Sequence, residues 1–295
     1  MAFTMRPTRG INLQSTYTWS KNLGVFGEVG RTFTDPRDRH ADYAPLPDNI
    51  RHDFRTNGTF TLPIGPNRAF FGTTTGALAR ILENWSTSWI VNLNTGVPIT
   101  ISTFNAADAA RGFVATGHQS LYANGTPDIV GPFDIQGKAS FANGASSGTY
   151  FMDGKLKPVV DPQCANVTTS DNLRAACSLN AIADATTGQI LLQNPLPGNR
   201  GTLGMSSAEA PGRWRFDANV AKSVKLTETK NLQFRLDITN VFNHPEPNVL
   251  TAPAANVLTN HPLVNINAAN FGIITGADAK TNLHRQFQAQ LRLNF

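Results

Sequence analysis

The chain has 295 residues, of which 25 are Lys or Arg and 20 are Asp or Glu, so only 15% are charged and the formal net charge is +5. A soluble globular domain carries about 25% charged residues, and here uncharged polar residues take their place. The low net charge and the 18 Phe residues exclude disorder of the whole chain, the lack of a long apolar run excludes a transmembrane helix, and the lack of a basic cluster indicates no nucleic-acid partner.

Six segments alternate between apolar and uncharged polar side chains, which is the period of a β-strand. In chain order these segments are 11–19, 53–62, 85–94, 214–220, 232–239 and 286–295. The last is the clearest, because Phe287, Leu291, Leu293 and Phe295 share one face while Gln, Arg and Asn occupy the other. The pattern predicts an all-β protein with antiparallel neighbours.

The connections between these segments are long and short in turn. Connections 21–50, 96–212 and 242–283 are long, whereas 63–84 and 222–231 are shorter. Outer-membrane barrels have long loops outside the cell and short turns in the periplasm. Their strands also carry an apolar outer face and a polar lumen face, whereas the solvent faces of a soluble sandwich are rich in Lys and Glu. The sequence therefore favours a segment of a transmembrane β-barrel with long extracellular loops.

Three C-terminal stretches are specific enough to indicate a family. They read NPLPGNRGTLGMSSAEAPGRWR at 194–215, NLQFRLDITNVFNHP at 231–245 and FGIITGADAKTNLHRQFQAQLRLNF at 271–295. Together they resemble the C-terminal barrel of Oar-like TonB-dependent outer-membrane transporters, and TYTWSKNL at 16–23 extends the resemblance upstream. The resemblance implies energy-coupled uptake of an unidentified ligand across the outer membrane of a Gram-negative bacterium.

The resemblance also implies what surrounds the barrel in the whole protein. Family members begin with a signal peptide, a carboxypeptidase-regulatory-like module and a plug domain that contacts TonB, and none of these is recognised in this sequence. We therefore expect 1–295 to be the C-terminal part of a barrel with roughly 22 strands, supplying about six to eight of them. Contact with TonB is expected only through the plug. The other partners expected are outer-membrane lipid, the barrel-assembly machinery and the transported ligand.

A second reading belongs to another class of protein. The chain could be a secreted or surface-exposed β-rich binding or adhesion protein whose long loops contact another surface. Under neither reading do we expect an enzyme, a catalytic residue, a metal site or a cofactor. A G-x-S-x-G sequence at 144–148 lacks the preceding buried strand and following helix of a nucleophile elbow, so we interpret it as a loop.

Two groups of residues at the C-terminus and in the longest connection are candidates for particular roles. The resemblance makes Phe287, Leu291, Leu293 and Phe295 the signal that the barrel-assembly machinery reads, although any strand can end in Phe. Cys164 and Cys177 are the only cysteines and lie in the longest connection. In an oxidising environment they are expected to form a disulfide, with two free thiols as the alternative. They have no C-x-x-C spacing, which argues against zinc.

Charged and aromatic side chains on the strands are the remaining candidates. Asp53 and Arg55, and likewise Arg235 and Asp237, place opposite charges two residues apart on the expected lumen face. Such charges can line a substrate path, but the reading we favour is that they pair across neighbouring strands and hold the wall. Six aromatic residues of the strands are expected either in girdles at the two membrane surfaces or in ordinary packing; they are Tyr17, Trp19, Trp85, Trp89, Trp214 and Phe216.

Overall fold

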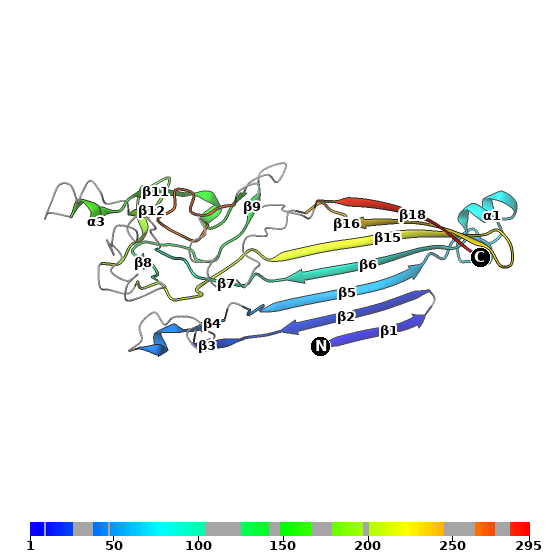
Figure 1. Cartoon of the computed structure of the whole chain (residues 1–295), viewed down its shortest axis with the longest axis horizontal. Helices are drawn as coiled ribbons and strands as arrows, with labels where there is room; N and C mark the ends of the chain where they lie inside the picture. The colour runs from blue at the N-terminus through cyan, green and yellow to red at the C-terminus, as the bar shows by residue number, and fades with distance from the viewer. Residues whose placement is uncertain are drawn as a thin grey trace.

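A single seven-stranded antiparallel sheet forms the body of the protein (Figure 1). The computed structural model describes residues 1–8, 10–25, 38–46, 48–103, 125–141, 148–166, 179–196, 201–244, 263–274 and 284–295. The strands, in their order across the sheet, are β1 (Ala2–Thr8), β2 (Ile11–Trp19), β5 (His52–Thr61), β6 (Trp85–Asn94), β15 (Arg213–Lys225), β16 (Asn231–Thr239) and β18 (Gln286–Asn294). The expected all-β antiparallel fold is therefore confirmed, and all six expected strands are present.

The seventh strand, β1, was not expected from the sequence. It pairs with β2 from Ala2 to Met5 and again at Thr8, with an irregularity between these two stretches. Pro7 lies in this interval and has no N–H to donate to a sheet. Among the described residues β1 lies at the edge of the sheet, where a proline is tolerated. Because of the proline and the short apolar pattern, the alternation of side chains does not predict this strand.

The strands have the length that a membrane requires. β5 and β6 have 10 residues each, and β2, β16 and β18 have 9. At about 3.3 Å per residue and a tilt of about 40°, ten residues cover about 25 Å of bilayer, which is the height of the apolar band of outer-membrane barrels. Among the described residues, no helix has the length and apolar character needed to cross a bilayer.

The pairing register aligns apolar side chains on one face of the sheet and polar side chains on the other, with Ile90 on the polar face and Lys222 on the apolar face as exceptions. Phe54 pairs with Leu93, and Leu93 pairs with Trp214, so apolar side chains align across three strands. One residue further along β5, Arg55 pairs with Asn92, and polar side chains align on the opposite face. A shift of one residue would exchange the two faces. We call these the apolar face and the polar face.

The two ends of the sheet differ. At one end lie the short connections, including the one that contains α1 (Gly76–Leu82), and at the other lie the long ones (Figure 1). The first long connection contains β3 (Leu23–Val25), η2 (Arg39–Asp42) and β4 (Tyr43–Pro45). The expected alternation of long and short connections is therefore reproduced as two ends of one sheet.

The other two long connections fold together into a unit that we call the cap, formed by the described residues of 95–212 and 263–274. Its sheets have the orders β17-β10-β9, β11-β12-β13-β8 and β14-β7. Its helices are η3 (Met152–Gly154) and α3 (Pro162–Ala165). Its strands are β7 (Pro98–Ile99), β8 (Asp128–Ile129), β9 (Ser140–Phe141), β10 (Gly148–Thr149), β11 (Leu156–Val160), β12 (Asn180–Asp184), β13 (Ile190–Gln193), β14 (Ala208–Glu209) and β17 (Ile273–Ile274).

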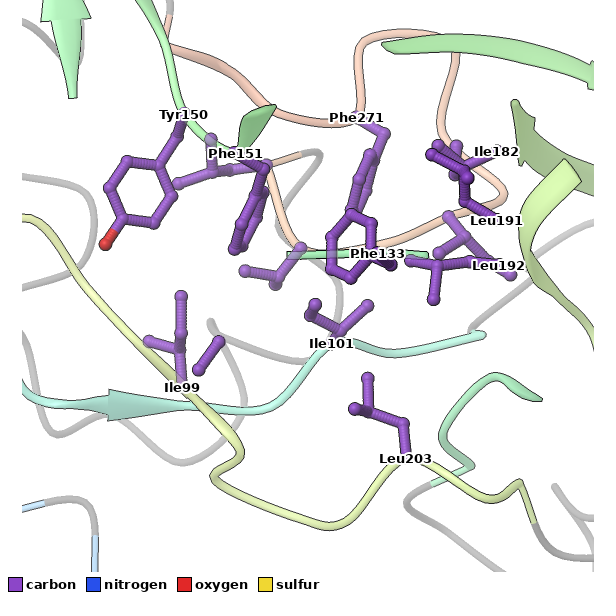
Figure 2. Close-up of a cluster of buried hydrophobic side chains, with 14 of the residues drawn as sticks. Ile99, Ile101, Phe133, Tyr150, Phe151, Ile182, Leu191, Leu192, Leu203 and Phe271 are labelled. Carbon is purple, nitrogen blue, oxygen red and sulfur yellow. The ribbon is translucent and has the colours of Figure 1, made fainter. Parts of the chain in front are cut away.

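The cap has a hydrophobic core of its own (Figure 2). Phe151 is fully buried in this core, and its ring centroid lies 5.6 Å from those of both Phe133 and Phe271. Phe271 belongs to the β16–β18 connection and the other two to the β6–β15 connection, so the core joins two parts of the chain that are distant in sequence. The core also contains Ile99, Ile101, Tyr150, Ile182, Leu191, Leu192, Leu203, Leu263, Val264, Ile266 and Ile274.

A buried polar network also joins the two connections of the cap. The Asn267 side chain donates to the Thr103 carbonyl oxygen at 2.8 Å and to the Asn194 side-chain oxygen at 2.9 Å, and its own oxygen accepts from the Asn180 N–H at 2.8 Å. The Asn194 amide in turn donates to the buried carboxylate of Asp161 at 2.8 Å. Because buried polar groups are costly unless they are paired, this network fixes how the two connections meet.

Candidate functional site: the polar face of the sheet

The polar face is hollowed along its length. One hollow has a volume of about 550 Å³ and is lined by residues that include Gln14, Thr16, Thr18, Asp53, Arg55, Asn57, Ile90 and Asn92. A second hollow of about 300 Å³ shares Arg55 and Asn92 with the first, and a third of about 160 Å³ shares Ile90. The three hollows therefore form one continuous depression across β2, β5, β6, β15 and β16, which we call the polar trough.

Opposite charges in the trough are paired two residues apart along the same strand. Arg55 binds Asp53 at 2.8 Å, and Arg235 binds Asp237 at 2.7 Å. Our expectation that these charges would pair across neighbouring strands is not what the structure has. In a strand, residues i and i+2 lie on one face. A long Arg side chain that lies along its own strand therefore reaches the carboxylate two residues away.

A third pair was missed in the sequence although its spacing is the same. Arg215 donates to the Asp217 carboxylate at 2.9 Å, so the trough carries three Arg–Asp pairs of one kind. The signal that could have found it is the R-x-D spacing that also identified Arg235 and Asp237. Arg213 adds a further positive charge to the lining of the trough. Four Arg and three Asp side chains therefore line the trough, which is close to neutral.

The chemistry of the trough is hydrogen bonding to a polar molecule. Exposed Arg–Asp pairs contribute at most about 1 kcal/mol to stability, so their effect is to hold guanidinium and carboxylate groups along the wall. Amides and hydroxyls fill the spaces between the pairs. Among the described residues, no group of three or more His, Cys, Asp or Glu side chains is placed to hold a metal ion. Such a lining can exchange hydrogen bonds with a polar molecule.

Asp217 also fixes the end of the neighbouring strand. Its carboxylate accepts a hydrogen bond at 2.7 Å from the backbone N–H of Asn240, the residue after β16. Asn240 has a φ of 48°, and its side-chain oxygen accepts from the His244 N–H at 2.9 Å. The His244 ring lies 4.3 Å from the Trp214 ring. The turn that follows β16 is therefore tied to both faces of the sheet.

The apolar face is exposed over its whole width. Ten of its aromatic and aliphatic side chains are between 37% and 67% exposed: Phe3, Tyr17, Trp19, Phe54, Leu93, Val220, Phe234, Phe287, Leu291 and Leu293. A continuous exposed apolar surface of this extent marks contact with a membrane or another protein. On strands of spanning length opposite a polar trough, it is the surface that lipid covers.

Aromatic side chains gather at the cap end of the apolar face. The Tyr17 hydroxyl is 2.8 Å from His52 Nδ1 at this end. Trp214 lies 5.7 Å from Phe242 there, centroid to centroid. Trp85 begins β6 at the opposite end, as a girdle requires. Trp89 is different, because it pairs with Gly58 in the middle of the strands, so it is a packing residue and not part of a girdle.

The C-terminal candidates lie on this face. Phe287, Leu291 and Leu293 project from β18, and Phe295 follows the strand and is 93% exposed. Their recognition by the barrel-assembly machinery stays a prediction.

The cysteine and G-x-S-x-G candidates lie in the cap or outside the described residues. Cys164 is in α3, is 4% exposed and is disulfide-bonded. Cys177 lies outside the described residues, so the pairing of these two cysteines stays a prediction. Residues 144–147 of the G-x-S-x-G sequence also lie outside them.

These features define a class of protein: an antiparallel wall of membrane-spanning strands, with one face for lipid and one for water. A family model described as outer membrane beta barrel domain matches residues 1–288, and the chain belongs to that family. The family points to the outer membrane of a Gram-negative bacterium. No curated protein and no solved structure matches the chain.

Proposed function

We propose that the chain forms part of the barrel of an Oar-like TonB-dependent transporter that imports a polar ligand. The observation that carries the proposal is the polar trough, which continues from the middle of the strands to Asn94 and Arg213 at the cap end. A ligand held by the cap would enter the trough at this end. The sequence resemblance over 194–215, 231–245 and 271–295 supplies the transporter type.

The paired charges suit transport better than tight binding. The guanidinium groups of Arg55, Arg215 and Arg235 already have a carboxylate partner on their own strand, so a ligand gains little net energy by displacing one. Many weak sites in a row allow a molecule to move from one to the next, since conduction requires binding that is favourable but readily reversed. The ligand class implied is polar, with both donors and acceptors.

Energy coupling would come from elements outside this sheet. In the family that the sequence resembles, TonB contacts a plug domain that fills the barrel, and the plug would rest against the polar face. The trough would then contact the plug domain as well as the ligand.

The proposal can be tested without knowing the ligand. Cells with and without the gene are grown in a peptide-rich medium, and the spent medium is compared by untargeted mass spectrometry. We expect compounds that are depleted only by cells with the gene, and we expect their depletion to stop in a tonB deletion strain. Depletion that persists without TonB would indicate a passive pore and contradict the proposal.

A binding or adhesion role at the cell surface is the second candidate. It is favoured by exposed apolar side chains on the cap, namely Val130, Val160 and Leu196, which are 51%, 71% and 58% exposed. This role would leave the composition of the medium unchanged and would persist in the tonB deletion strain. Attachment of intact cells to a surface, measured with and without the gene, separates it from transport.

A further inference from the structure

The connections opposite the cap expose a group of large apolar side chains. In the β5–β6 connection, Phe70, Phe71, Leu78 and Ile81 are 61%, 60%, 54% and 60% exposed, and in the β15–β16 turn Leu226 is 54% exposed. We call these five residues the turn-end patch. The two connections touch, because the Arg80 guanidinium is 3.4 Å from the Lys225 carbonyl oxygen. Polar turns do not normally concentrate apolar surface in this way.

Helix α1 is fastened to the apolar side of the sheet. The Trp85 indole N–H donates to the Ile81 carbonyl oxygen at 2.8 Å, and the Lys222 ammonium donates to the carbonyl oxygens of Arg80, at 2.7 Å, and of Glu83. Trp85 and Lys222 pair with each other in register, and Lys222 also pairs with Phe234 of the apolar face. The last carbonyls of the helix are therefore held on the lipid side of the wall and not on the trough side.

The exposed side of α1 points away from the protein. Ala79 is buried, whereas Leu78 and Ile81, three residues apart on the same side of the helix, are exposed. In Figure 1 the helix lies at the end of the sheet where β15 and β16 meet their turn. The exposed side chains of α1 therefore lie beyond the strands on the apolar side of the sheet, at the level where the bilayer ends, and the rest of the turn-end patch lies in the same two connections.

Charged residues around the patch match a phospholipid surface. Arg68, Arg80 and Lys230 are exposed in these two connections, as is Lys225 at the end of β15, and the connections also contain Glu83 and Glu228. An apolar group framed by an excess of Lys and Arg is the arrangement of interfacial helices, whose apolar side enters the acyl boundary while the cations contact phosphates.

We propose that the turn-end patch inserts into the periplasmic leaflet and sets the depth of this wall in the bilayer. The occupant is phospholipid, at the boundary between headgroups and acyl chains. The proposal rests on the family assignment and on the orientation that short turns give, and it does not depend on TonB-dependent transport. The alternative occupant, a periplasmic protein, would leave the patch accessible to water in isolated membranes.

Cysteine labelling in opened outer-membrane fragments tests the proposal. Leu78→Cys and Ile81→Cys report on the patch, Thr227→Cys is the water-exposed control in the neighbouring turn, and Leu291→Cys is the control on the lipid face. Under non-reducing conditions the parent chain gives the background. We expect a charged maleimide to label positions 78 and 81 about tenfold more slowly than position 227, because charged reagents do not enter the acyl boundary. Position 291 should be labelled as slowly as 78 and 81. A fluorophore coupled to the same thiols in urea, before refolding into vesicles, should be quenched by brominated lipid at 78, 81 and 291 and not at 227, whereas maleimide labelling itself requires a thiolate in contact with water.

Two results would overturn the proposal. Labelling of 78 and 81 by the charged reagent at the rate of 227 would place the patch in water. Slow labelling by the charged reagent without quenching by brominated lipid would place it against protein. The substitutions are expected to leave the fold intact, because α1 is held through its carbonyl groups and not through these side chains. Equal rates for all variants in urea would show that the thiols are equally reactive.

Discussion

Trp89 lies across Gly58 so closely that a Cβ built on the glycine would be 2.4 Å from Cζ2 of the indole and 2.7 Å from the Asn12 carbonyl oxygen. Gly58→Ala should therefore destabilise the sheet by about 1 to 3 kcal/mol, since the backbone oxygen cannot move aside as a side chain can. Gly204→Ala is the matched control, because nothing lies within 4 Å of its Cβ position. Urea unfolding in lipid vesicles, followed by tryptophan emission, measures both. Equal stability of the two variants would contradict the packing.

The two faces of the sheet should respond differently to a new charge. Leu236 pairs with Val220 and Ala289 on the apolar face, whereas Gln288 pairs with Asp237 on the polar face. Leu236→Arg should cost about 2 to 4 kcal/mol near the middle of the bilayer, and Gln288→Arg should be tolerated because it meets a carboxylate. The measurement is the free energy of folding into vesicles. A cost for Gln288→Arg as large as that for Leu236→Arg would mean that the faces are assigned wrongly.

Asn267 should hold the two connections of the cap together. Asn267→Ala removes the partners of the Thr103 carbonyl oxygen, the Asn194 side-chain oxygen and the Asn180 N–H. Leaving such buried groups unpaired should cost the cap about 3 kcal/mol. Limited proteolysis of membranes from intact cells should then cleave the cap much faster than in the parent. Lys157→Ala, on an exposed position of β11, serves as the control and should change nothing.

The cap should lose stability in alkali through Tyr150. Its hydroxyl donates to the Glu209 carbonyl oxygen, and burial, together with the charge of Glu209, raises the pKa of Tyr150. A raised pKa means that the stabilisation is fully present below the unfolded value of about 10 and is lost as the pH rises above it, since the unfolded state then releases its proton more easily.

The variant Tyr150→Phe isolates this effect. It should be less stable than the parent by about 1 kcal/mol at neutral pH, because a hydrogen bond is lost. Its stability should then fall less than that of the parent between about pH 10 and 11.5. Thermal unfolding at several pH values measures the difference. Parallel curves for the two proteins would show that Tyr150 does not carry the alkaline loss.

A disulfide in the cap should protect both cysteines from alkylation. Cys164 is disulfide-bonded, and Cys177 is the only other cysteine of the chain. Closing a loop of this length is worth about 3 kcal/mol in the chain-entropy model. Mass spectrometry after alkylation with and without reductant tests the pairing. Modification of both residues without reductant would exclude it.

The strands were predictable because their signal is local. Alternation along 232–239 or 286–295 can be read within one segment, and the length of each connection follows directly. The Arg–Asp pairs follow from the same period, although the choice of partner along the strand, for example Asp53 for Arg55, depends on how an extended side chain folds.

The cap and the fastening of α1 were not predictable for the opposite reason. The strands of the cap have two to five residues, too few for a period to be visible, and its core joins residues as distant as Ile99 and Ile274. Lys222 follows the predicted strand 214–220, and it holds α1 by donating hydrogen bonds to carbonyl groups of the β5–β6 connection. Such contacts depend on tertiary structure that no single segment encodes.

The shared core of the cap has a consequence for how firmly the wall is held. Phe133, in the β6–β15 connection, and Phe271, in the β16–β18 connection, both pack against Phe151 in one core. The cap is therefore complete only after the strand pairs β6–β15 and β16–β18 are both in place. With the cap outside the cell, each hairpin could leave the bilayer only if that core first came apart. The rate at which these strands leave the bilayer is then set by the rate at which the cap unfolds, and not by the equilibrium between inserted and free strands. The cap would give the wall a long lifetime in the membrane even where its margin of stability is small.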